Sequence, residues 1–150
     1  MELKNQADNI FYNNKKFKMN SALHNLIMQI KNGKKSGLKM IQINGNLSNI
    51  CIDILNILQN EGYIEKFKQN TKKNIIITTI YLKYKQNGQS NITSITKISK
   101  PSCLIFSTSS LLWQIKSGLG LFIVSTSKGI LTCNDARLLN VGGKVLYSIV

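Results

Sequence analysis

The stretch of the sequence that is most informative about its fold is GLGLFIVSTSKGILT, residues 118–132. The apolar run over 121–124 predicts a buried strand over 121–125, because short apolar runs between turn signals are typical of such strands. Residues 125–129 are polar and predict a loop, and residues 130–132 predict a second strand. The stretch therefore indicates a strand, a polar loop and a returning strand.

The loop combines three hydroxyl side chains with a cation and a glycine. Ser125, Thr126 and Ser127 do not suit a strand that is buried on both faces. Hydroxyl and backbone N–H groups can contact phosphate oxygens, ribose hydroxyls and base edges. Lys128 adds a positive charge, and Gly129 permits close approach or a positive φ. On composition alone, an RNA-binding loop and a Ser-rich surface turn are equally good interpretations.

Sequence periodicity predicts the elements around this stretch. In the first half, one helix spans 21–32 and ends at Gly33, and a second follows a cap within 46–48 and ends at Gly62. Asn87-Gly88 is a hairpin-turn signal. Strands are expected near residues 41–43, 63–68, 75–84, 92–98, 103–106, 121–125, 130–132 and 144–150. Short helices are expected from Ser109 or Ser110 through Ile115, and from Asn134 or Asp135 through Leu139.

Helices and strands without regular βαβ alternation favour an α+β fold, in which two small packed subdomains contain antiparallel sheets and short helices. We expect a basic N-terminal extension over 1–19, an α+β subdomain over 20–99, and a second one over 100–150 that carries the polar loop. The acids Glu2 and Asp8 in the extension, which lacks Arg, argue against a cleaved targeting peptide.

The charge balance indicates a polyanionic partner. The chain has 20 basic and 6 acidic residues, a net charge of +14, and its one arginine is Arg137. Nucleic acid is the first candidate partner and an anionic membrane surface the second. No apolar run approaches the roughly 18–20 residues of a membrane span. The membrane alternative, a peripheral basic protein, needs a basic amphipathic helix with exposed aromatic residues, which neither predicted helix provides.

The sequence offers no catalytic, metal or cofactor site. Both the phosphate-loop and the dinucleotide-binding glycine patterns are incomplete. His24 is the only histidine, no CxxC pair is present, and no two of the six carboxylates are close in sequence. We therefore expect no enzymatic activity, no metal, no cofactor and no small-molecule substrate. Three cysteines at long spacing argue against a disulfide framework.

The stretch 118–132 closely resembles the signature of the small-subunit ribosomal protein eight family. Ala136-Arg137 and Gly142-Gly143 stand at the places that the family pattern requires. Three upstream blocks are also similar, at residues 30–33, 58–64 and 98–101. The resemblance covers about residues 20–150.

This resemblance implies direct binding to the central domain of small-subunit rRNA, early in assembly, beside neighbouring small-subunit ribosomal proteins. It makes the STSKG loop the main rRNA contact. The RNA-binding residues that it implies are Ser125, Thr126, Ser127, Lys128, Gly129, Lys100, Pro101, Phe106, Gly142, Gly143, Lys144, Lys31 and Asn32. For Arg137, RNA contact and a local pairing, for example with Asp135, are both open.

Several positions depart from the family pattern. Lys100 and Lys31 replace arginines and lose the planar, bidentate guanidinium. Leu104 replaces a further arginine, Phe106 a tyrosine and Lys144 a glutamate. The abundance of Lys, Asn and Ile follows A/T-rich codons, which favours a mitochondrial ribosome. A plastid or the cytoplasm of an A/T-rich bacterium are the alternatives.

Overall fold

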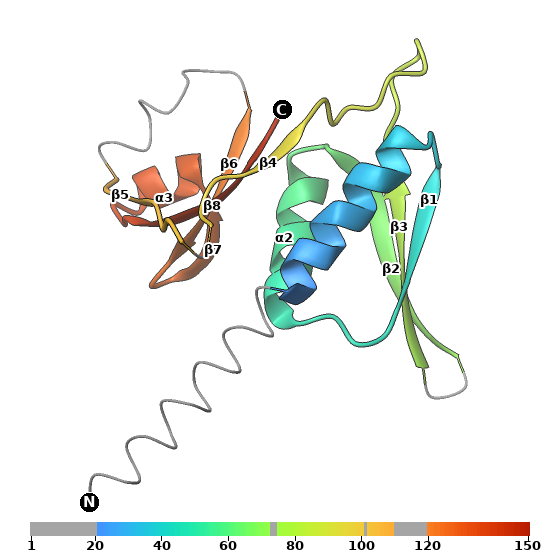
Figure 1. Ribbon diagram of the computed structural model, residues 1–150, viewed down its shortest axis with the longest axis horizontal. Helices are drawn as coiled ribbons and strands as arrows, with labels where there is room; N and C mark the ends of the chain where they lie inside the picture. The colour runs from blue at the N-terminus through green and yellow to red at the C-terminus, as the bar shows by residue number, and fades with distance from the viewer. Residues whose placement is uncertain (1–20, 73–74, 101, 110–119) are drawn as a thin grey trace, which may run out of the picture.

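The computed structural model describes residues 21–72, 75–100, 102–109 and 120–150 (Figure 1). The N-terminal extension over 1–19, Pro101 and the helix expected through Ile115 lie outside the described residues. Within them the architecture is α+β, with two antiparallel sheets and short helices, as the sequence predicts.

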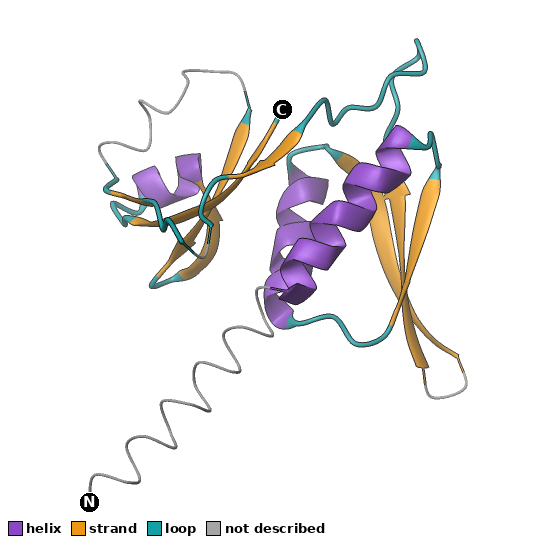
Figure 2. Cartoon of the chain, viewed as in Figure 1, coloured by secondary structure: helices purple, strands orange, loops and turns teal. Residues whose placement is uncertain are grey.

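The first sheet has three strands, in the order β1-β3-β2, and all of its pairs are antiparallel. Its strands are β1 (Met40–Asn44), β2 (Ile64–Lys72) and β3 (Ile75–Leu82). A helix over 21–35 and α2 (Asn49–Asn60) both lie on one side of this sheet (Figure 2). The first half therefore forms two layers, helices on a sheet.

The first helix is longer than predicted. It continues through Gly33 to residue 35, so the expectation that Gly33 ends it was wrong. Gly33 is needed inside the helix, because a Cβ there would lie 2.5 Å from Ile41 Cδ1 of β1. The end is at Gly37, whose φ is +66°, and Leu38 N–H donates to Gly33 O at 3.0 Å. This is the Schellman pattern of helix ends.

The helix α2 ends as predicted. Gly62 has a φ of +74°, and Tyr63 N–H donates to Leu58 O at 2.9 Å. The buried residues Cys51, Ile54, Leu55 and Leu58 form one face of the helix. These side chains and the apolar face of the first helix fill the space above the sheet.

The second sheet runs in the order β4-β8-β6-β7, and β5 also pairs with β8. Its strands are β4 (Ile95–Lys97), β5 (Phe106–Ser107), β6 (Leu121–Thr126), β7 (Gly129–Thr132) and β8 (Gly143–Ile149). The strand β6 is central, and its first four residues, 121–124, are at most 5% exposed. The buried strand predicted from the apolar run is confirmed.

The strand β4 does not pair with β3. A tight turn does form at Asn87-Gly88, where Gly88 has a φ of +78°, and one bridge joins Tyr84 to Ser90. Beyond it the chain crosses to the second sheet, and Ile95 pairs with Ile149 of β8. Burial of Ile95 against the core explains this crossing, which a local turn signal does not report. The division into 20–99 and 100–150 stays a prediction.

The two halves share one apolar core. Ile123, Tyr147 and Ile149 of the second sheet belong to the same buried cluster as the two N-terminal helices. The opposite face of that sheet is covered by α3 (Cys133–Leu138), where Ala136 is completely buried. The helix α3 begins at Cys133 and not at Asn134 or Asp135 as expected, and its N-cap is Thr132. Thr132 Oγ1 accepts a hydrogen bond from Asp135 N–H at 3.1 Å.

Candidate nucleic-acid interface

The strand register brings most of the predicted RNA-binding residues to one end of the second sheet. Lys144 of β8 is paired with Phe106 of β5 on one side and with Ser125 of β6 on the other. Ser125 is also paired with Ile130 of β7. Paired residues share a sheet face, so these four side chains form one row across four strand ends.

A second row lies one residue further along, on the opposite sheet face. Gly143 is paired with Ser107 of β5 and with Thr126 of β6, and Thr126 is paired with Gly129 of β7. The paired residues of the two rows, which come from positions between 106 and 144, are therefore neighbours in space although they are far apart in the sequence. We call these two rows, together with Ser127 and Lys128 between β6 and β7, the strand-end site.

The polar loop is shorter than predicted. Ser125 and Thr126 are the last residues of β6 and Gly129 is the first of β7, so only Ser127 and Lys128 form the turn. The prediction that all of residues 125–129 form a loop was wrong, because hydroxyl side chains are compatible with a strand end that is only half-buried.

Thr126 closes this turn. Its hydroxyl donates to Gly129 O at 2.9 Å and accepts from Lys128 N–H at 3.2 Å. Gly129 has a φ of +115°, a conformation that L side chains rarely adopt. Ser127 and Lys128 are exposed at the tip, and within the described residues the hydroxyls of Ser125 and Ser127 have no side-chain hydrogen bond. Those two hydroxyls can therefore serve a ligand.

The glycine pair has a structural reason. A Cβ at Gly143 would lie 2.3 Å from Ser125 O, and a Cβ at Gly142 would lie 2.8 Å from Ser107 O. Any side chain at either position would push the neighbouring strand away. The glycines thus permit the close approach on which the two rows depend, and their predicted contact with RNA stays a prediction.

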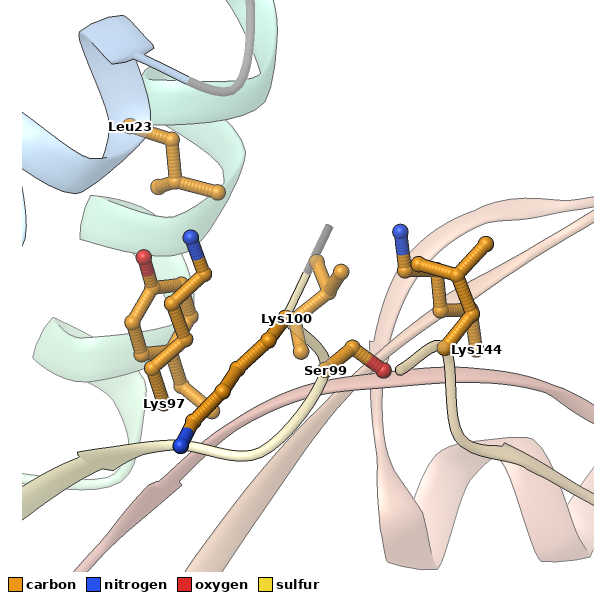
Figure 3. Close-up of a pocket in the computed structure, with 8 residues that line it drawn as sticks. Leu23, Lys97, Ser99, Lys100 and Lys144 are labelled. Carbon is orange, nitrogen blue, oxygen red and sulfur yellow. The ribbon is translucent and has the colours of Figure 1, made fainter. Parts of the chain in front are cut away.

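Three lysines surround a small pocket beside this site. Lys97, Lys100 and Lys144 line it together with Ser99 and Leu23, which comes from the first helix (Figure 3). Lys100 and Lys144 belong to the predicted set, whereas sequence reasoning did not select Lys97. The sequence hint for Lys97 was its position three residues before Lys100, but only the tertiary structure shows that both side chains line one pocket. Three ammonium groups around one hollow favour an anionic ligand.

The segment before β5 is held by Ser99. This buried side chain accepts a hydrogen bond from Ile105 N–H at 3.0 Å and donates to Ile105 O at 3.3 Å. Ile105 O also accepts from Val145 N–H of β8 at 3.0 Å. These bonds fix Phe106, which is 69% exposed, in its place at the edge of the site. An exposed aromatic ring beside cations can stack on a base.

Lys31 and Asn32 are not part of the strand-end site. They line a different hollow at the end of the first helix, with Lys34, Lys35 and residues 92–96. Lys34 Nζ donates to Thr93 O at 2.5 Å. The neighbouring Ile95 pairs with Ile149, at the opposite end of β8 from Lys144. The twelve predicted residues that the structure describes, all but Pro101, therefore fall on two separate surfaces.

Arg137 lies exposed in the last turn of α3, and within the described residues it forms no ion pair. The proposed partner Asp135 instead accepts from Thr132 Oγ1 at 2.8 Å. Among the same residues no group of three or more His, Cys, Asp and Glu side chains could hold a metal ion. None of the described helices is long and apolar enough to span a membrane.

The sequence is similar to a known protein family and to curated proteins of two bacteria. Residues 21–150 match the family model of ribosomal protein S8. The chain is 40% identical over 125 residues to small ribosomal subunit protein uS8 of Malacoplasma penetrans, covering 83% of this chain and 93% of that protein. It is 34% identical over 131 residues to the protein of the same name from Rickettsia massiliae, covering 87% and 98%.

Proposed function

Because the chain belongs to the ribosomal protein S8 family, we propose that it binds small-subunit rRNA directly through the strand-end site. The family consists of structural ribosomal proteins, so this chain is a component of the small ribosomal subunit and not an enzyme. The resemblance further supports a site in the central domain of the rRNA and binding early in subunit assembly.

The observation that carries the proposal is the pairing of Ser125 with Lys144 at the sheet end. It places a hydroxyl that has no side-chain hydrogen bond among the described residues beside a cation, and next to the exposed tip of Ser127 and Lys128. Hydroxyls can bond to ribose and base edges while lysines neutralise phosphates. The pre-formed turn lowers the entropic cost of ordering these groups on RNA.

The test is the affinity of the full chain for a central-domain rRNA fragment, measured by filter binding. Ser127→Ala combined with Lys128→Ala should lower the affinity about tenfold or more, since one good contact contributes roughly 1–3 kcal/mol. A matched control is Lys85→Ala with Gln86→Ala, which removes the same charge from an exposed turn outside the site. Unchanged binding by the first variant would contradict the proposal.

Lys97 is expected to contribute through its charge. Its position in the pocket with Lys100 and Lys144 supports contact with a phosphate. Lys97→Gln should lower the slope of log affinity against log salt concentration by about 0.7–0.9, the contribution of one phosphate contact. Lys85→Gln, at an exposed position outside this pocket, should leave the slope unchanged.

We also propose that the protein contacts neighbouring small-subunit proteins and that it belongs to a mitochondrial ribosome. Exposed apolar side chains at Leu138, which is 78% exposed, and Leu139 support contact with neighbouring small-subunit proteins. The Lys-, Asn- and Ile-rich composition supports a mitochondrial ribosome. Mass spectrometry of small subunits from purified organelles tests this proposal. Detection only in plastid ribosomes, or in the ribosomes of a bacterium, would contradict it.

A further inference from the structure

The strand-end site leaves one large polar surface of the molecule unused. In the first sheet, Ile41, Ile80 and Phe67 are paired across the three strands and pack in the core below the helices. Side chains alternate along a strand, so their neighbours lie on the opposite side. This outer sheet face consists of Met40, Gln42, Asn44, Lys66, Lys68, Asn70, Ile75, Ile77, Thr79 and Tyr81.

No element of the described chain packs on the outer sheet face. The two helices lie on the other side of the sheet (Figure 2). Met40 and Ile75 are 52% and 54% exposed, which is unusual for apolar side chains of a sheet. The amides of Gln42, Asn44 and Asn70 are exposed as well.

The charge on this face is positive. Lys66 and Lys68 are exposed on β2, two residues apart, which is about 7 Å along a strand. The strands β1 and β3 contain no acid, and β2 contains only Glu65, whose Oε1 lies 3.6 Å from Lys66 Nζ. Lys66 Nζ also lies 5.2 Å from the centroid of the Tyr81 ring. The face thus combines two cations, an aromatic ring and three amides.

We propose that the outer sheet face binds an unpaired segment of RNA. Lysines attract the phosphates, the Tyr81 ring and its cation offer a stacking surface, and exposed amides can bond to base edges. Those edges are free in an unpaired strand and inaccessible in an A-form duplex. An acidic protein segment would pair with the lysines but has no bases to stack on the Tyr81 ring, so the observations favour RNA.

The experiment measures the affinity of the full chain for single-stranded decauridylate at several salt concentrations. Lys66→Gln with Lys68→Gln should lower the slope of log affinity against log salt by about 1.4, since each single-strand phosphate contact contributes about 0.7. Tyr81→Thr keeps strand propensity and should lower the affinity about fivefold or more by removing one stacked base. Thermal unfolding of each variant checks that the fold is retained.

The matched control is Lys83→Gln with Lys85→Gln, which removes equal charge from residues beyond β3. Lys83 Nζ lies near Gly62, just beyond the end of α2. A similar loss in this control, or an unchanged slope in the Lys66 and Lys68 variant, would overturn the proposal. So would a stronger effect of that variant on binding to polyglutamate than to RNA.

The test of the outer sheet face can fail while the proposed function of the strand-end site stands, and the reverse also holds. The Ser127 and Lys128 variant should retain decauridylate binding at the outer face while it loses the rRNA fragment. Loss of both ligands in that variant would show that the oligonucleotide occupies the strand-end site, and it would overturn the second site alone.

Discussion

Lys144 lies directly opposite Ser125 in the antiparallel pair of β8 and β6. These two residues are nineteen positions apart in sequence and become neighbours because Gly143 lets the strands approach closely. The arrangement leaves Ser125 without a side-chain hydrogen bond among the described residues, whereas Thr126 is fully used by the turn. The two adjacent hydroxyls therefore differ: the turn uses that of Thr126, whereas that of Ser125 is available for the proposed RNA contact.

Thr126 is expected to stabilise the turn through its hydroxyl. Thr126→Val keeps the shape of the side chain but removes both hydrogen bonds, to Gly129 O and from Lys128 N–H. It should lower the free energy of unfolding by about 0.5–1.5 kcal/mol in urea denaturation. Thr126→Ser retains the hydroxyl and should recover most of this loss. Equal stability of the valine variant and the parent would show that the turn does not need these bonds.

Gly143→Ala should be more damaging than Gly129→Ala. At Gly143 the new Cβ would meet the Ser125 carbonyl at 2.3 Å, and backbone must move. We expect a loss of about 3 kcal/mol or more, as for severe overpacking, together with weaker rRNA binding. At Gly129 there is open space and only the φ of +115° is unfavourable, so the loss should be about 1 kcal/mol. The reverse order in thermal unfolding would contradict this account.

Ser99 is expected to hold the segment that leads to Phe106. Ser99→Ala leaves the Ile105 N–H without its side-chain acceptor, and should cost about 1–3 kcal/mol of stability. Hydrogen exchange at the Ile105 amide should become faster. Ser102→Ala, at an exposed position in the same segment, should change neither quantity. Protection of Ile105 that survives the Ser99 substitution would refute the role.

The stability of the protein should fall in alkaline solution partly through Tyr147. Burial raises the pKa of the Tyr147 phenol above its ordinary value of 10, and the charge of Cys51 raises it further. The unfolded chain then loses the proton first. The stabilisation from this group is complete below about pH 10 and declines as the pH rises toward the folded pKa.

Tyr147→Phe removes this contribution. Between the unfolded and the folded pKa, its free energy of unfolding should fall less steeply than that of the parent, by up to about 1.4 kcal/mol per pH unit. Denaturation curves at pH 7 and above pH 10 measure the difference, and the pH 7 curves should be close to each other. Parallel declines of the two proteins would exclude Tyr147 as a cause.

Local signals predicted the elements well wherever one short segment contains the whole cause. The apolar face of the first helix, the stop of α2 at Gly62 and the buried strand β6 are of this kind, since periodicity and a positive-φ glycine are properties of a few adjacent residues. The predicted helix end at Gly33 was wrong, because the local sequence does not distinguish a glycine that ends a helix from one that lets a strand approach the helix.

The sequence by itself determined the family, the α+β class and the polar tip at Ser127 and Lys128, because a long signature and local periodicity do not depend on distant residues. Only the tertiary structure decided that β4 joins the second sheet, that Lys97 shares a pocket with Lys144, and that Lys31 lies on a separate surface. These outcomes follow from burial of Ile95 and from strand register, which depend on contacts between residues far apart in the chain.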